Sequence, residues 1–290
     1  MKNFSRRSFI SKSGKGLTAS VALSGLSFPA FIRNMGLVID QPFGFQTWIV
    51  REMLAKDFPG TLKIMANEGY QQMEMCSPEG YVDSGFGPLT KIKPADMKKI
   101  INDAGLTCPS CHFGFEELTD HLDERIEWSK QLGLSVMVCS SFGLPKTATL
   151  DDYIKACDKL NKAGEKIKKA GMQTGYHNHE TEFAILDNRL IYDELMKKFD
   201  PNLVKMQFQT EVINLGYKAS TYFNRYPGRF ISAHLSDWTA EKKEVPIGQG
   251  IIDWKEFFAA AKTGGVKYFY VEMSFDTMAP SATYLKQLTL

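Results

Sequence analysis

Short apolar runs rich in β-branched and aromatic residues alternate with longer amphipathic segments along the chain from Phe43 onward. Short apolar runs are typical of buried strands, whereas apolar positions spaced three and four residues apart indicate helices. Strands are expected at residues 43–49, 70–75, 106–113, 135–140, 172–178, 204–209, 229–235 and 268–273. The clearest helical segments are residues 95–103, 122–131, 153–170 and 254–261.

Several helical segments end in a glycine that leads directly into the next predicted strand: Gly69, Gly105, Gly133 and Gly171. Glycine adopts positive φ without steric cost, so it ends a helix and turns the chain. Strands that alternate with helices form parallel βαβ units. Eight such units within one domain's length predict an α/β fold, a closed (β/α)8 TIM barrel.

Residues 1–34 differ from the rest, because they hold six basic and no acidic residues around an apolar stretch at 17–31. That stretch is too short and too rich in Ser and Gly for a membrane-spanning helix. Residues 5–10, Ser-Arg-Arg-Ser-Phe-Ile, resemble a twin-arginine export signal. We therefore expect an export signal at 1–34, one catalytic barrel domain at 35–290 and a periplasmic location. A frayed basic N-terminus is the competing interpretation.

The net charge of the chain outside residues 1–34 limits which partners it can bind. Six of the 35 basic residues and none of the 33 acidic residues lie in 1–34, so the remaining chain has a net charge of −4. Phosphate binding requires a basic face, and a nucleic-acid partner is therefore disfavoured. The cysteines are odd in number and scattered, unlike a disulfide framework, and we expect buried thiols. They are Cys76, Cys108, Cys111, Cys139 and Cys157.

Ionisable side chains occur where the predicted strands end, which is where a barrel builds its active site. They are Glu74, His112, His177, His179, Glu211, His234 and Glu272. A lone strand-end histidine is more often a core residue, but this many imidazoles and carboxylates need a cation or shared protons to offset their desolvation. The sequence therefore predicts a divalent ion, Mn²⁺, Co²⁺, Mg²⁺ or Zn²⁺, that holds sugar oxygens and stabilises an enediolate.

A series of short motifs follows the predicted strands in order. They include Gly-Phe-Gln-Thr-Trp at 44–48, Ser-Cys-His at 110–112, Gly-Tyr-His-Asn-His-Glu-Thr-Glu-Phe at 175–183, Tyr-Pro-Gly-Arg-Phe-Ile-Ser-Ala-His-Leu-Ser-Asp at 226–237, Val-Pro-Ile-Gly-Gln-Gly-Ile-Ile-Asp-Trp at 245–254 and Val-Glu at 271–272. In this order and spacing the motifs resemble those of the xylose isomerase-like TIM barrel sugar (phosphate) isomerase/epimerase family. The resemblance extends from Phe43 to Met273.

The resemblance implies a metal held by Glu, Asp, His and Glu from the last four strands. The matching positions are His177, Glu211, His234 and Glu272. His177 stands where Glu is common and Glu211 where Asp is common, which leaves the metal and its first ligand open. Glu182 is an alternative ligand.

The same site is expected to hold the catalytic and substrate-binding groups. His179 is the candidate acid/base, and Glu182 is either its catalytic partner or a cap on a backbone N–H. Trp48, Glu74 and His112 are expected to line the sugar pocket. For Glu74 and His112 buried hydrogen bonding is the alternative, and for Trp48 it is core packing.

The leading hypothesis is a sugar or keto-sugar isomerase/epimerase acting on a small carbohydrate. The alternatives are a lyase or hydrolase of 3-keto-glycosides, a catalytically silent sugar-binding barrel, and an endonuclease-IV-like enzyme, which the acidic charge opposes. Cys108-Pro-Ser-Cys111-His112 also matches a c-type haem motif, but both thiols could not reach a haem from inside a strand. The oligomeric state is left open.

Overall fold

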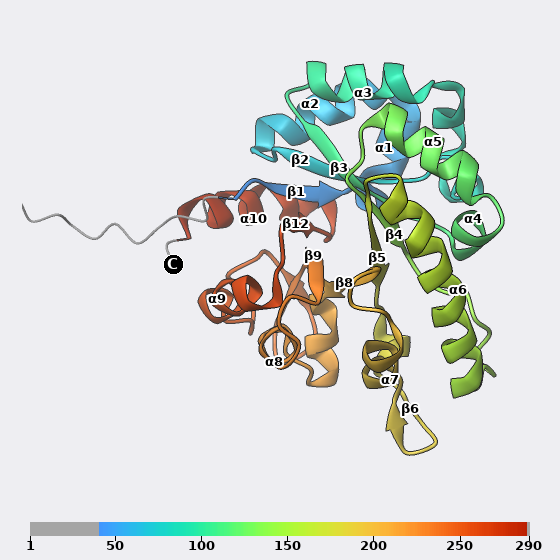
Figure 1. Ribbon diagram of the computed structural model, residues 1–290. Helices are drawn as coiled ribbons and strands as arrows, with labels where there is room; N and C mark the ends of the chain where they lie inside the picture. The colour runs from blue at the N-terminus through green and yellow to red at the C-terminus, as the bar shows by residue number, and fades with distance from the viewer. Residues whose placement is uncertain (1–40, 289–290) are drawn as a thin grey trace, which may run out of the picture. The chain divides into compact units, whose positions relative to one another are not determined.

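The computed structural model describes residues 41–288, so the predicted export signal and the predicted boundary at 34/35 lie outside the described residues. Eight parallel strands close into a barrel in the order β1-β12-β9-β8-β5-β4-β3-β2 (Figure 1). The predicted (β/α)8 barrel is confirmed. The strands are β1 (Phe43–Gln46), β2 (Gln72–Cys76), β3 (Thr107–Phe113), β4 (Val136–Cys139), β5 (Gln173–His177), β8 (Val204–Gln209), β9 (Phe230–Leu235) and β12 (Tyr268–Val271).

Helices connect the strands and lie around the outside of the barrel (Figure 1). They are α1 (Arg51–Lys56), α2 (Phe58–Glu68), α3 (Pro94–Asp103), α4 (Phe115–Thr119), α5 (Leu122–Leu132), α6 (Leu150–Lys169), α7 (Ile191–Lys198), α8 (Ala219–Arg225), α9 (Trp254–Gly264) and α10 (Phe275–Gln287). Within residues 41–288, none of them combines the length and the apolar character that crossing a membrane requires.

Shorter elements decorate the loops of the barrel. Two antiparallel hairpins follow β5 and β9, and short 3₁₀ turns follow β1, β2, β5 and β8. The hairpins pair β6 (Ile185–Leu186) with β7 (Arg189–Leu190) and β10 (Asp237–Trp238) with β11 (Glu244–Val245). The 3₁₀ turns are η1 (Thr47–Val50), η2 (Val82–Ser84), η3 (Gly87–Lys91), η4 (Glu180–Phe183) and η5 (Thr210–Leu215).

Element boundaries differ from the prediction where a side chain ends or starts a segment. The first strand was expected to reach residue 49 but ends at Gln46, because the Gln46 side chain accepts the Trp48 N–H and starts η1. Helix α6 begins before the expected residue 153, because Thr149 and Asp152 form a capping box. The predicted glycine helix ends are confirmed, as Gly69 and Gly133 show with φ of 107° and 90°.

Alternate residues of each strand face opposite sides of the barrel wall. Along β8, Phe208 packs against Tyr192 of α7 and Phe223 of α8, whereas Gln207 bonds to Glu74 of β2. Because β2 lies opposite β8 in the strand order, that hydrogen bond crosses the barrel interior. The main apolar core therefore lies between strands and helices, while the interior is largely polar.

Gly44 of β1 lies at a crowded point inside the barrel. A Cβ atom added there would meet the backbone oxygen of Gln72 at 2.6 Å and the ring of Tyr270 at 2.8 Å. These neighbours belong to β2 and β12, the two strands that pair with β1. A side chain at residue 44 would therefore push apart the strands that close the barrel.

We expect Gly44→Ala to lower the free energy of unfolding by about 1 to 3 kcal/mol, because overpacking in a barrel wall forces backbone shifts. Urea unfolding followed by circular dichroism measures this. Gly114→Ala is the control, since φ at Gly114 is −63° and its added Cβ lies 3.6 Å from the nearest atom. Equal stability of the two variants would contradict the crowding argument.

Candidate active site

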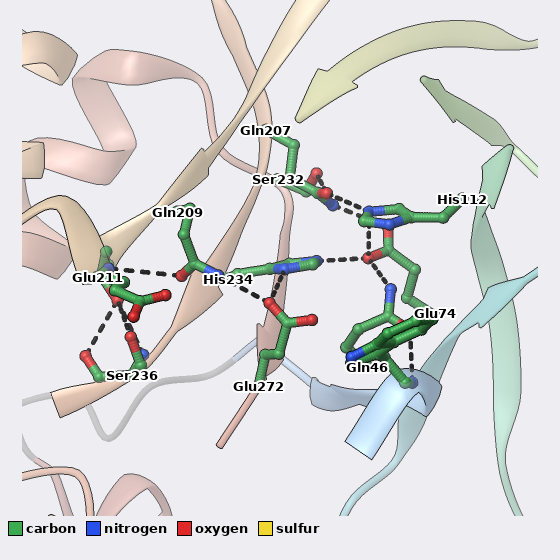
Figure 2. A network of polar contacts seen from close by, with 12 residues as sticks. Gln46, Glu74, His112, Gln207, Gln209, Glu211, Ser232, His234, Ser236 and Glu272 are labelled. Carbon is green, nitrogen blue, oxygen red and sulfur yellow. Dashed lines mark hydrogen bonds and ion pairs between the residues drawn. The ribbon is translucent and has the colours of Figure 1, made fainter. Parts of the chain in front are cut away.

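A buried carboxylate on β2 connects five side chains from four other strands. Both oxygens of Glu74 are inaccessible to solvent and accept hydrogen bonds inside the barrel (Figure 2). Oε1 accepts from Ser110 Oγ at 2.6 Å and from Gln207 Nε2 at 2.8 Å. Oε2 accepts from Gln46 Nε2 at 2.8 Å and from His234 Nε2 at 2.5 Å, with His112 Nε2 at 3.2 Å.

Three imidazoles lie above this carboxylate at the carboxyl ends of their strands. They are His112 of β3, His177 of β5 and His234 of β9, and all are buried. Their ring centroids lie 4.4 to 5.2 Å apart, and each offers a nitrogen within 4.8 Å of the others. His179, whose ring lies 4.7 Å from that of His177, is exposed to solvent.

His234 bridges two carboxylates. Its Nε2 donates to Glu74, and its Nδ1 donates to Glu272 Oε2 at 2.8 Å (Figure 2). Glu272 is held in turn by Gln209, whose Nε2 donates to the same oxygen at 2.7 Å. Burial opposes a charge on His234, but Glu272 and Glu74 raise its pKa to about 10. The imidazole is therefore protonated between the two acids.

The other ionisable groups of the cluster differ in how their surroundings shift their pKa values. Burial alone would raise the pKa of Glu74, but His112 and His234 hold it well below its usual range. Burial also favours the neutral form of Glu272, yet His234 lowers its pKa. Burial lowers the pKa of His177 well below its usual range, and the other imidazoles act in the same direction. The site thus combines ionised carboxylates with a neutral imidazole.

The donor set fits a divalent metal ion. Within residues 41–288, no hydrogen-bond partner faces Nδ1 of His177, although the side chain is 2% exposed. A buried polar atom without a hydrogen-bond partner is uncommon and indicates that another group, such as a metal ion, binds it. Neutral imidazole nitrogens next to carboxylates such as Glu272 are ligands that Zn²⁺, Co²⁺ and similar ions accept.

The four predicted metal ligands are not all brought together. His177 and His234 belong to the imidazole group found within residues 41–288, and Glu272 bonds to His234, but the third member of that group is His112 rather than Glu211. Glu211 lies one residue beyond the start of η5 and is half-buried. Burial and nearby acids, including Glu272, raise its pKa.

Glu182, predicted as a catalytic residue or alternative ligand, is occupied by local hydrogen bonds. Its carboxylate accepts from the Tyr176 hydroxyl at 2.9 Å, the His179 backbone N–H at 2.7 Å and the Thr181 hydroxyl at 3.0 Å. This is the capping interpretation that the sequence left open. Glu182 therefore fixes the backbone at His179, the predicted acid/base.

The predicted substrate-binding residues occupy two levels. Trp48 lies on η1 at the rim and is 37% exposed, although Phe86 stacks on its indole and the Arg51 guanidinium lies 4.5 Å from the ring centroid. His112 is 5% exposed and donates to Gln207 Oε1 at 2.6 Å. Glu74 has no exposed surface, so it supports the imidazoles from below and does not line an open pocket.

The sequence analysis missed the neutral polar residues that complete the network. Each is an interior position of a barrel strand and bonds to Glu74, Glu272 or one of their partners. A parallel strand that is buried on both faces is usually apolar throughout. The alternation of Val, Met and Phe with Lys and Gln in β8 was therefore a signal for an interior polar network. The missed residues are Gln46, Ser110, Gln207, Gln209 and Ser232.

The cysteines do not form a haem or disulfide site. All five are free and buried, as expected. Cys111 and His112 are adjacent in β3, so their side chains face opposite sides of the barrel wall. Burial raises the pKa of Cys108 to about 12, so its thiol is protonated.

The arrangement defines a TIM barrel whose carboxyl-terminal face holds a buried cluster of imidazoles and carboxylates, the usual location of a catalytic site in this fold. The profile of the xylose isomerase-like TIM barrel family matches residues 62–288, and the chain belongs to this family.

Other proteins resemble the chain in sequence or in fold. The chain is 26% identical to the inosose dehydratase of Lacticaseibacillus casei over 235 residues, covering 67% of this chain and 78% of that protein. A sugar phosphate isomerase/epimerase from Parabacteroides distasonis superposes with a TM-score of 0.74 at 27% identity, covering 85% and 94% of the two chains. The IOLI protein, solved with a zinc atom, shares the fold with a TM-score of 0.61 at 13% identity, covering 85% and 94%.

Asp237 organises the loop that follows β9. Its buried carboxylate accepts the backbone N–H groups of Gly248, Gly250 and Ile252 and the indole N–H of Trp254, at 2.9 to 3.3 Å. These bonds assign the Asp237 side chain to the loop. One carboxylate thus holds residues 248–254 at the edge of the site.

We expect Asp237→Asn to lower the free energy of unfolding by about 1 to 3 kcal/mol, because the NH₂ group of asparagine cannot accept the three hydrogen bonds that Oδ2 accepts from Gly248, Gly250 and Trp254. Asp253→Asn is the matched control. Asp253 caps α9 through Oδ1, which asparagine retains, so its change should be below about 0.5 kcal/mol. Thermal unfolding of both variants tests this, and a similar loss for both would contradict the assigned role.

Proposed function

We propose that this protein is a metal-dependent enzyme that removes a proton next to the carbonyl group of a sugar or keto-sugar and returns it, as an isomerase or epimerase does. The observation that carries the proposal is the buried group of His112, His177 and His234 with Glu74 and Glu272 at the carboxyl ends of the strands. Membership of a family with carbohydrate-modifying members supports it.

The residues of the site have different proposed roles, which follow from where they lie. His177, His234 and Glu272 would hold a divalent ion, which would displace the proton between His234 Nδ1 and Glu272. Lewis-acid polarisation of the substrate's carbonyl and hydroxyl oxygens is the chemistry that such an ion supplies. Glu74 fixes the ring of His234 from below through the bond to Nε2. Trp48 would contact a sugar at the rim through the part of its indole that stays exposed beside Arg51.

His179 is the proposed acid/base. Its ring lies beside that of His177. Although part of the residue is exposed, the protein around the ring desolvates it and lowers its pKa, so the imidazole is neutral near pH 7 and can accept a proton. Glu182 accepts the His179 backbone N–H and thereby positions the ring. A proton taken from the α-carbon onto His179 and delivered to the neighbouring carbon gives an isomer. Epimerisation requires a second acid on the opposite face of the carbon, which delivers a proton there while His179 keeps the one that it removed.

A lyase is the second candidate. The inosose dehydratase relative, at 26% identity, favours it. After the same proton abstraction, the electrons of the enediolate expel a substituent at the β-carbon, and no proton is returned to the α-carbon. Keto-glycosides and inososes are therefore substrates to test beside ketoses.

We expect the protein to catalyse the exchange of solvent deuterium for the hydrogen on the carbon next to the carbonyl of a ketose, keto-glycoside or inosose. NMR measures this exchange. His179→Ala should lower the rate about 100- to 10,000-fold, and chelation of metal should abolish exchange. His121→Ala, at an exposed helix start, should leave the rate unchanged.

The products separate the candidates, because epimerised sugar indicates the first and released water or aglycone the second. Exchange that survives both chelation and His179→Ala would contradict the mechanism. Bound metal without exchange into any of these substrates would indicate a sugar-binding barrel.

We also propose that the protein is exported, with residues 1–34 as a twin-arginine signal. Replacing both Arg6 and Arg7 with lysine should keep the full chain in the cytoplasm of a bacterial host, measured by cell fractionation. Replacing Lys12 and Lys15 with arginine preserves charge outside the arginine pair and should leave export intact. Equal distribution of both variants would contradict a twin-arginine signal.

A further inference from the structure

The composition of the imidazole cluster indicates which metal ion the protein binds. This inference rests on the proposed function, which requires such an ion. The metal ligands implied by the family resemblance are mostly oxygen donors, with one imidazole. In this chain His177 places a nitrogen where a carboxylate is common, and His112 offers a third imidazole nitrogen within 4.8 Å of those of His177 and His234.

The position of β8 explains why Glu211 stays outside this cluster. Residues 207 and 209 face the interior, where both glutamines bond to cluster carboxylates. The strand ends at Gln209, and the chain then turns into η5, which carries Glu211 away from the strand-end position. Gln209 therefore occupies the interior site at the end of β8, and it donates to Glu272.

The charges of the cluster match a divalent cation. When His234 gives up the proton between its Nδ1 and Glu272 and acts as a neutral ligand, Glu74 and Glu272 contribute two negative charges that no other member of the cluster offsets. A dication balances those two charges, which a buried site requires. The unpaired Nδ1 of His177 is a second, independent indication of a missing partner within residues 41–288.

We propose that His112, His177 and His234 together bind one divalent transition-metal ion, with Glu272 beside them, and that Glu211 is not a ligand. Nitrogen-rich sites favour Zn²⁺, Co²⁺ or Ni²⁺, whereas Mg²⁺ and Mn²⁺ prefer carboxylate, carbonyl and water oxygens. Of the four ions that the sequence left open, this donor set selects Zn²⁺ and Co²⁺ over Mg²⁺ and Mn²⁺.

Cobalt binding to the whole purified protein, stripped with a chelator and dialysed, tests the proposal without an activity assay. We expect one Co²⁺ per chain, a visible absorption spectrum typical of nitrogen coordination, and displacement by Zn²⁺ but not by excess Mg²⁺. His112→Asn should weaken Co²⁺ binding more than about 100-fold, since loss of an outer partner alone costs roughly 10- to 100-fold. Glu211→Gln should weaken it far less.

Two controls keep the test decisive. His121→Asn removes an exposed imidazole and should not change the affinity. If His112→Asn does not fold, ¹⁵N NMR of wild-type imidazoles decides, because Zn²⁺ should shift the ring nitrogens of three histidines into the coordinated range and leave His121 unchanged. A Co²⁺ affinity that depends on Glu211 and not on His112, tighter Mg²⁺ than Zn²⁺ binding, or only two coordinated imidazoles would overturn the proposal.

The two proposals fail separately. If deuterium exchanges into the substrate but the Co²⁺ affinity depends on Glu211, the proposed enzyme function stands and the three-imidazole site is refuted. Nitrogen-coordinated Co²⁺ without exchange into any keto-sugar would support the site and refute the function.

Discussion

The carboxylate of Glu74 is the constraint on which the rest of the site depends. An ionised carboxyl group without solvent is tolerated only when hydrogen bonds and opposite charge replace its hydration. Here Gln46, Ser110, Gln207 and His234 supply these partners from four other strands. Because β2 and β8 lie on opposite sides of the closed sheet, the network exists only when the barrel is closed, and folding and site assembly are one event.

The two faces of each strand serve different purposes. The outer face carries residues such as Phe208 and Tyr176, which pack against helices and supply the apolar burial that stabilises the domain. The inner face carries hydrogen-bonding groups that hold His234 and Glu272 in place through partners with no exposed surface. A ligand at the rim therefore meets imidazoles whose orientation is already set, which lowers the cost of reaching a reactive geometry.

Barrels related to this chain carry different activity names, isomerase/epimerase and dehydratase. Isomerisation, epimerisation and dehydration begin with the same proton abstraction beside a carbonyl, so one scaffold supports relatives with different products. In this chain the strand-end residues of β5 and β8 are His177 and Gln209, which makes the cluster richer in nitrogen and poorer in charge. Such changes alter the preferred ion and the electrostatic field over the substrate without disturbing the barrel.

The sequence by itself determined the eight strand–helix units, the glycines that end helices and the presence of imidazoles at strand ends, because these depend on local periodicity and turn chemistry. It could not assign partners to those imidazoles. His234 and Glu74 are 160 residues apart, so only barrel closure brings them together. The end of β8 decided that Gln209 and not Glu211 faces the interior. The Tyr176 hydroxyl holds Glu182 in its capping position. Neither could be predicted from the sequence, because each depends on contacts that form only when the chain packs.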